Sequence, residues 1–372
     1  MLFFLTNSLI VDANDNSYNG IFKTVQNLAI QAIDGSHVIS GTYEAIAHFR
    51  EVFKHDPTVG LYFNSLYQNF ATLSIPNELL FYIEVVKENP VCRSEDGREI
   101  CQKDYMCYQA IDSCSATRLI GEDLNDTYFF IHILNWYINQ LSKNFHYHFH
   151  SLGGGGKNTY RIVQNEISAR HIVICIVDTD KKYPNCPPEK NGTYDMCVNL
   201  LTNNACDYCF LPLNVHEIEN IIPLNYIDLF DNWSQGNAND QRKKRAFDFL
   251  CSDKTVAEEI LPYFDYKKGI KKDSLFQNNL DYQNFAKKCY EANVDKINKN
   301  PSFENYVNSL QDKGEIYPNL IGGSGILVNT LELINSKKCP PPILLDFQKN
   351  NWESIGKILL SWGIARDTES IS

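Results

Sequence analysis

Apolar residues form short unbroken runs in some parts of the chain and recur at helical spacing in others. The run at 172–177, IVICIV, is too short for a buried helix and rich in β-branched residues. It therefore predicts a central strand of a parallel sheet. Between Phe129 and Leu141 the apolar positions instead follow a period close to 3.6, which predicts an amphipathic helix.

The same patterns divide the chain into three successive segments. Residues 1–115 are expected to form an N-terminal accessory α/β segment: a strand at 2–11, helices at 20–33, 42–53, 61–73 and 78–86, and an extended loop with a short helix at 88–115. Residues 116–230 alternate strands and helices, with strands at 117–120, 145–151, 172–177 and 208–213, and a helix capped by Asn214. Residues 231–372 are expected to be mostly helical, with helices at 255–263, 282–297 and 352–362. Alternation of this kind is typical of a parallel α/β sheet with flanking helices.

Composition narrows the class of protein. The 372 residues are 44% hydrophobic and 21% charged, as in globular proteins, and the formal net charge is −11. Such a charge excludes a basic protein that coats nucleic acid by counterion release, but not a nuclease whose acidic site uses a metal. No run of 18 apolar residues and no basic leader is visible, so we expect a cytoplasmic protein without a membrane segment and with its 12 cysteines mostly reduced.

Acidic residues follow three of the predicted strands. They come in three pairs: Glu122 and Asp126, Asp178 and Asp180, and Glu217 and Glu219. Because the carboxyl ends of parallel strands meet at one edge of a sheet, we expect these carboxylates to share one cleft, although the i, i+2 spacing of the last pair predicts that only one of its members faces it. So many carboxylates would repel without cations, and two Mg²⁺ ions would suit phosphodiester hydrolysis.

This ordered set resembles the Toprim domain, in which Glu-x-x-x-Asp follows one strand and Asp-x-Asp a later one. Topoisomerases, bacterial primases and the OLD (overcoming lysogenization defect) nucleases share that domain. LIGEDLNDTYFFIHIL, the four glycines at 153–156, VDTD at 177–180 and HEIENIIP at 216–223 resemble the nuclease branch and the small Toprim effectors of bacterial antiphage defence. Asp123 stands where that family usually has glycine. The resemblance covers residues 116–230, extends loosely into the helical tail and leaves out residues 1–115.

The resemblance implies roles for individual residues. Glu122 would be the general base or a metal ligand. Asp126, Asp178, Asp180 and Glu217 or Glu219 would complete the sites for two Mg²⁺ ions, for which Mn²⁺ can substitute. A downstream lysine, Lys267 or Lys268 in YFDYKKGIKK, would stabilise charge on the phosphate. From the residues alone, a solvated basic face is the favoured interpretation of these two lysines.

The expected function is therefore that of a Mg²⁺-dependent endonuclease that cleaves DNA or RNA, serving as a toxic effector of antiphage defence. Gly153–Lys157 lacks the first glycine and the final Ser or Thr of a Walker A motif, since Ser151 and Asn158 stand there. An ABC-type ATPase acting in trans is thus the partner that the resemblance implies, and self-association stays open. The alternatives are a Toprim fold kept as a binding or assembly module without catalysis, and a topoisomerase-like or primase-like Toprim enzyme.

Two further groups resemble zinc ligands. His146, His148 and His150 alternate along one predicted strand, and Cys206 and Cys209 form one C-x₂-C pair. A packed or surface face is the favoured interpretation of the histidines, and the irregular spacing of the cysteines upstream of Cys206 argues against a complete zinc site.

Overall fold

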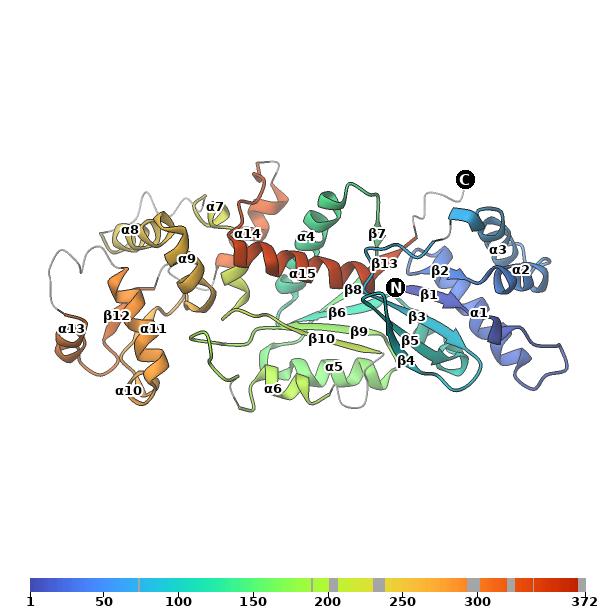
Figure 1. Cartoon of the computed structure of the whole chain (residues 1–372), viewed down its shortest axis with the longest axis horizontal. Helices are drawn as coiled ribbons and strands as arrows, with labels where there is room; N and C mark the ends of the chain where they lie inside the picture. Colours follow the sequence, from blue (N-terminus) through green and yellow to red (C-terminus); the bar gives the residue numbers. More distant parts are fainter. Residues whose placement is uncertain are drawn as a thin grey trace. The chain divides into compact units, whose positions relative to one another are not determined.

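The computed structural model describes residues 1–72, 74–188, 190–200, 207–229, 238–292, 302–319, 325–336 and 338–366 (Figure 1). The chain divides into two compact units, which are described separately. The first comprises Met1–Ile176, Cys197–Leu211 and Glu353–Ser372, and the second comprises Val177–Met196 and Pro212–Trp352. The middle segment predicted from the sequence, 116–230, contributes to both units.

The first unit opens with a five-stranded sheet in the order β2-β1-β3-β5-β4. Its strands are β1 (Leu2–Leu5), β2 (Val38–Gly41), β3 (Phe81–Val86), β4 (Cys92–Glu95) and β5 (Arg98–Asp104). Pairing is parallel except between β4 and β5. The accompanying helices are α1 (Tyr18–Ile33), α2 (Tyr43–Val52) and α3 (Val59–Gln68), with short 3₁₀ helices η1 (Asn7–Leu9), η2 (Phe70–Thr72), η3 (Tyr105–Tyr108) and η4 (Ile111–Cys114). The N-terminal segment is therefore α/β, as predicted.

Two predictions for this segment are wrong. The helix expected at 78–86 is the strand β3, and the loop expected at 88–115 contains the hairpin of β4 and β5. Every residue of β3 is buried, because the strand lies inside the sheet, so its apolar positions do not alternate with polar ones. The buried Glu84 in this strand is paired by two hydrogen bonds from Arg93 of β4.

The middle of the chain forms a four-stranded sheet in the order β10-β9-β6-β8, within a mixed α/β fold. Its strands are β6 (Thr117–Gly121), β8 (Phe149–Gly153), β9 (Val173–Val177) and β10 (Tyr208–Pro212). β6 pairs in parallel with both β8 and β9. Helices α4 (Leu124–Leu141) and α5 (Thr159–Ser168) both pack on β6, and Figure 1 shows them on opposite faces of the sheet. The predicted parallel sheet with flanking helices is confirmed.

The strand predicted at 145–151 is divided in two. β7 (His146–Tyr147) pairs antiparallel with β13 (Ile364–Ala365), whereas β8 pairs with β6. His148 lies between the two strands and donates its backbone N–H to the carbonyl of Gly363 at 2.8 Å. The C-terminal strand thereby joins the first unit, and the N-terminal amine of Met1 also bonds to the carbonyl of Ile364.

The glycine run after β8 closes over the end of β6. Gly154 N–H donates to the carbonyl of Gly121 at 2.8 Å, and the N–H groups of Gly155 and Gly156 donate to that of Glu122 at 2.9 and 3.1 Å. Gly155 and Gly156 have φ values of +75° and +61°, a conformation that glycine adopts at least cost. This tight turn fixes the backbone of Glu122 at the carboxyl end of its strand.

The second unit is mostly helical. Its helices are α7 (Leu224–Ile227), α8 (Ala238–Ser252), α9 (Lys254–Ile260), α10 (Ser274–Asn278), α11 (Leu280–Glu291), α13 (Phe303–Ser309) and α14 (Ile326–Asn335), with 3₁₀ helices η7 (Ile218–Ile221) and η9 (Leu261–Tyr263) and the antiparallel pair β11 (Ile270–Lys271) and β12 (Glu315–Tyr317). Elsewhere lie η5 (Gly156–Asn158), α6 (Thr193–Val198) and α15 (Asp346–Gly363).

Three predicted C-terminal helices correspond to α9, α11 and α15, and the part predicted at 293–297 lies outside the described residues. Asp253 caps α9 by accepting the N–H groups of Thr255 and Val256, which explains why that helix begins where it does. No helix in the described part of the chain is both long and apolar enough to cross a bilayer.

Candidate metal-binding and catalytic site

The segment after β10 does not form the helix predicted from Val215. Residues 214–217 bend instead, and the 3₁₀ helix η7 begins only after Glu217, whose backbone is extended with φ −137° and ψ 167°. The reason is that His216 uses its backbone elsewhere: its N–H donates to the carbonyl of Pro262 at 2.7 Å, and its carbonyl accepts the N–H of Asp180 at 3.0 Å. Asn214 therefore caps no helix here.

Asn220 joins this segment to the chain just before Asp265. Its amide nitrogen donates to the carbonyls of Leu261 and Phe264 at 2.6 and 2.8 Å, and its amide oxygen accepts the N–H of Glu217 at 2.8 Å. Asn220 is buried, so its bonds to Leu261 and Phe264 are shielded from water. Asn220 thereby fixes the segment 214–220 against the segment that precedes Asp265.

The two predicted acidic segments of this unit lie side by side. Besides the bond from Asp180 to His216, the hydroxyl of Thr179 donates to the carbonyl of Val215 at 2.6 Å. Asp180 has a φ of +52°, so the chain turns sharply directly after β9. The Asp178–Asp180 turn thus adjoins the segment that carries Glu217 and Glu219, as expected for the ends of neighbouring strands.

Lys267 contacts both glutamates. Its ammonium nitrogen lies 3.0 Å from Oε2 of Glu217 and 2.9 Å from Oε1 of Glu219. Both glutamates reach the same ammonium because Glu217 precedes η7 in an extended conformation, so the pair does not follow helical geometry. That only one of them faces a metal stays a prediction.

The pKa values of Glu219 and Lys267 depend on each other. Burial raises the pKa of Glu219, and the attraction of Lys267 only partly opposes that rise. Burial alone would lower the pKa of Lys267, but Glu219 and Glu217 outweigh it, and the pKa is raised. Lys267 consequently stays protonated at neutral pH, with its charge held against two carboxylates.

The structure distinguishes between the two candidate lysines. The Lys268 side chain is 71% exposed, and its ammonium lies 3.6 Å from Oδ2 of Asp265. Lys267 is instead half-buried among the glutamates. Lys267 therefore matches the predicted role better, and Lys268 matches the solvated basic face.

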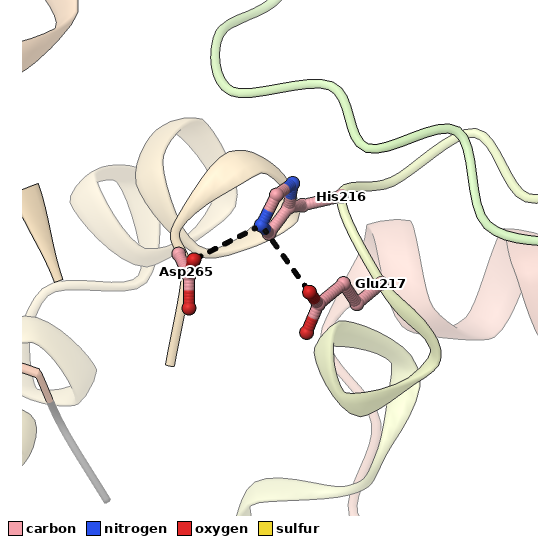
Figure 2. Close-up of side chains that lie close together, drawn as sticks. All are labelled: His216, Glu217 and Asp265. Atoms are coloured by element: carbon pink, nitrogen blue, oxygen red, sulfur yellow. Dashed lines mark ion pairs between the residues drawn. The ribbon is translucent and has the colours of Figure 1, made fainter. Parts of the chain in front are cut away.

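His216, Glu217 and Asp265 bring three ligand atoms together (Figure 2). Nε2 of His216 lies 3.7 Å from Oε1 of Glu217 and 3.5 Å from Oδ2 of Asp265, and the three atoms all lie within 4.8 Å of one another. Burial would raise the pKa of Asp265, but the imidazole of His216 and the N–H of Lys268 lower it to about 2. The Asp265 carboxylate is therefore ionised at neutral pH.

Sequence reasoning missed His216 and Asp265. Both stand within the motifs HEIEN and YFDYKK, directly beside or close to predicted site residues. A histidine next to an acid was the available signal. That the two motifs meet follows from the bonds of Asn220 and Pro262, which no local pattern predicts.

Glu122 and Asp126 lie in the first unit, Glu122 in the turn between β6 and α4 and Asp126 in the first turn of α4. Asp126 accepts the backbone N–H of Asp123 through Oδ2 at 2.8 Å, so it forms part of the cap of α4. The pKa of the buried Cys175 thiol in β9 is raised by burial first, then by Cys197, and then by the charge of Glu122, which places that charge near the strand. A role for Glu122 and Asp126 in metal binding stays a prediction.

The structure tests only one of the two groups that resemble zinc ligands. Among the described residues, the three-ligand group that converges is His216, Glu217 and Asp265, so His146, His148 and His150 do not form one. Their division between β7, the intervening residue and β8 explains this. Cys206 lies outside the described residues, and with it the predicted C-x₂-C pair.

Comparisons with known proteins find no similar protein. No family model, curated protein or solved structure matches the chain. Its function is therefore inferred from the residues described above.

Proposed function

We propose that this chain is a metal-dependent nuclease with a Toprim-like core that hydrolyses phosphodiester bonds of DNA or RNA. One observation carries the proposal: the bond from Asp180 N–H to the carbonyl of His216 joins the Asp178–Asp180 turn to the segment of Glu217 and Glu219. Since Lys267 contacts both glutamates, two of the acids predicted to bind metal lie beside a lysine predicted to contact phosphate.

The donor set suits Mg²⁺ or Mn²⁺. Asp178, Asp180, Glu217 and Glu219 offer carboxylate oxygens, the hard ligands that these ions prefer. A bound ion would polarise a phosphate oxygen and activate water for in-line attack. The half-buried ammonium of Lys267 would stabilise negative charge that develops on the phosphate, and its two glutamates would hold it in position.

The resemblance to Toprim nucleases supplies the remaining roles. It supports Glu122 as general base or ligand and Asp126 as a further ligand, both at the carboxyl end of a parallel strand. It also supports a toxic effector of antiphage defence acting in the cytoplasm, with an ABC-type ATPase as partner in trans. With a net charge of −11, the chain needs cations to approach a polyanionic substrate, which fits a metal-dependent activity.

Cleavage assays test the proposal. Purified protein would be incubated with plasmid DNA and with tRNA, each with Mg²⁺ or Mn²⁺, beside the variants Glu122→Ala and Glu217→Gln. We expect cleavage of at least one substrate, with the rate reduced by about 100-fold or more in both variants, as for other groups that act on developing charge.

Glu259→Gln is the matched control, because Glu259 also pairs with a lysine, Lys288, at 2.8 Å but on an exposed surface. Its activity should equal that of the wild type. The proposal would be contradicted if neither substrate were cleaved with either metal. It would also be contradicted if Glu217→Gln and Glu259→Gln reduced the cleavage rate equally. Either result would favour a binding or assembly module.

A further inference from the structure

We propose that His216, Glu217 and Asp265 bind one divalent transition-metal ion, of the Mn²⁺ or Zn²⁺ type, in preference to Mg²⁺. The site uses a histidine and an aspartate outside the predicted acidic set. It is a proposal about metal binding, and it holds or fails whether or not the chain cleaves nucleic acid.

His216 is a buried polar side chain without a hydrogen-bond partner. The residue is 2% exposed, and neither ring nitrogen bonds to any described residue. The nearest carboxylate oxygens, at 3.5 and 3.7 Å from Nε2, lie beyond hydrogen-bonding distance. A buried polar group left unpaired is costly. A metal ion bound at Nε2 would give the imidazole the partner that it lacks.

The two carboxylates each divide their oxygens between different partners. Oδ1 of Asp265 accepts the backbone N–H groups of Lys267 and Lys268 at 2.9 and 2.7 Å, which turns Oδ2 toward His216. Oε2 of Glu217 contacts Lys267, whereas Oε1 faces His216. Each acid is thus oriented through one oxygen and presents the other to the imidazole, as supporting bonds orient ligands in metal sites.

The spacing of the three atoms fits one ion. Ligands about 2.1 Å from a metal in tetrahedral geometry are separated by about 3.4 Å. The two distances from Nε2 of His216 are 3.5 and 3.7 Å, so small shifts of the side chains would suffice. Three protein ligands leave a position open for water or a substrate oxygen, which is the arrangement of a catalytic rather than a structural metal.

The imidazole decides which ion is preferred. Nitrogen ligands favour Mn²⁺, Zn²⁺ and other transition metals, whereas Mg²⁺ prefers a shell of oxygen ligands and water. Glu217, Glu219 and Asp265 supply negative charge, and Lys267 and Lys268 offset part of it. Since Lys268 is exposed, its ammonium can move into solvent when the ion binds.

Metal binding to the full-length chain tests the proposal. After removal of metals by chelation, the protein would be titrated by calorimetry with Mn²⁺, Zn²⁺ and Mg²⁺, without nucleic acid. We expect one equivalent of Mn²⁺ or Zn²⁺ that binds more tightly than Mg²⁺, and pulsed EPR of bound Mn²⁺ should show coupling to an imidazole nitrogen. His216→Ala and Asp265→Asn should each weaken binding by roughly 100-fold or more, since even groups that only support a ligand contribute 10- to 100-fold.

Two substitutions serve as matched controls. In Asp265→Asn the amide oxygen can still accept the two N–H groups, and Asp253→Asn makes the same change at another cap that accepts two N–H groups, those of Thr255 and Val256. His55→Ala removes an exposed histidine of the first unit. Both controls should bind the ion normally. No bound equivalent of Mn²⁺ or Zn²⁺, an absent nitrogen coupling, or binding that survives Asp265→Asn in a folded protein would overturn the proposal.

Discussion

The backbone N–H of Asp180 donates to the carbonyl oxygen of His216 at 3.0 Å, and this bond joins two acidic motifs that are separate in the sequence. The N–H of His216 in turn donates to Pro262, close to Asp265 and Lys267. The backbone of His216 is therefore the point at which three stretches of the second unit meet. The ligand group of His216, Glu217 and Asp265 comes from two of these stretches, so its geometry depends on these main-chain bonds as much as on the acids.

Removing Lys267 should destabilise the protein. Lys267→Ala leaves Glu217 and Glu219 without their shared cation, and the Glu219 side chain is only 7% exposed. Because an unpaired buried carboxylate is costly, we expect the free energy of unfolding in urea to fall by roughly 2 kcal/mol. Lys288→Ala is the control, since its ion pair with Glu259 is exposed and should contribute less than about 1 kcal/mol. An equal fall in the free energy of unfolding in the two variants would show that the ion pair with Glu219 stabilises the protein no more than an exposed pair does.

A pH-dependent stability is expected from Glu84 in the first sheet. Burial would raise the pKa of Glu84, but the hydrogen bonds from Arg93 outweigh it, and the pKa is lowered. A carboxylate whose pKa is lowered in the folded state stabilises the protein above its unfolded pKa, about 4.3, and this stabilisation is lost as the pH falls through the folded pKa. Glu84→Gln should thus reduce the free energy of unfolding by roughly 2 kcal/mol at pH 7, and the difference from wild type should shrink in acid.

The same arginine provides the control for Glu84. Glu95 pairs with Arg93 at 3.4 Å, but its side chain is exposed to solvent. Glu95→Gln should therefore change the free energy of unfolding by less than about 1 kcal/mol at neutral pH. Urea unfolding of both variants at pH 7 and at pH 3 checks this, and a Glu84→Gln difference that grows in acid would contradict the assignment.

Much of the fold follows from local patterns, because strands such as β6 and β9 and helices such as α4 are specified by their own apolar spacing. The apolar pattern of β3 wrongly predicts a helix, since a strand buried on both faces loses the alternation that marks strands at a surface. The short β7 and β13 were not separable from the sequence, because each exists only through pairing with the other.

The candidate site, like the fold, is only partly predictable from local sequence patterns. Acids at strand ends could be named because the carboxyl edge of a parallel sheet is fixed by topology, and Lys267 followed from a family resemblance. His216 and Asp265 could not be paired in advance, because their meeting depends on Asn220 and Pro262. Contacts made by buried side chains between distant segments carry no periodic signal in the sequence.

Loss of Asn220 should separate these segments. Asn220→Ala removes the bonds to Leu261, Phe264 and Glu217, and leaves two buried carbonyls and one half-buried N–H without that partner. We expect the free energy of unfolding to fall by roughly 3 kcal/mol, since each unsatisfied buried group costs about 1 kcal/mol or more. Asn278→Ala, which removes one exposed bond to Ser274, should cost much less. Binding of Mn²⁺ or Zn²⁺ should weaken in Asn220→Ala at a temperature where the variant is folded.

Lys268 should oppose the proposed metal. Its ammonium lies 3.6 Å from Oδ2 of Asp265, the oxygen assigned to the ion, so Lys268→Ala removes both a competing partner and a repelling charge. Because the side chain is exposed, the gain in affinity for Mn²⁺ or Zn²⁺ should be modest, about two- to five-fold, and should diminish as salt is raised. Lys271→Ala, which removes an exposed lysine of β11, is the control and should leave the affinity unchanged. Calorimetric titration at low and high ionic strength measures both effects. Weaker binding in Lys268→Ala would mean that the ion does not use the Asp265 oxygen facing Lys268.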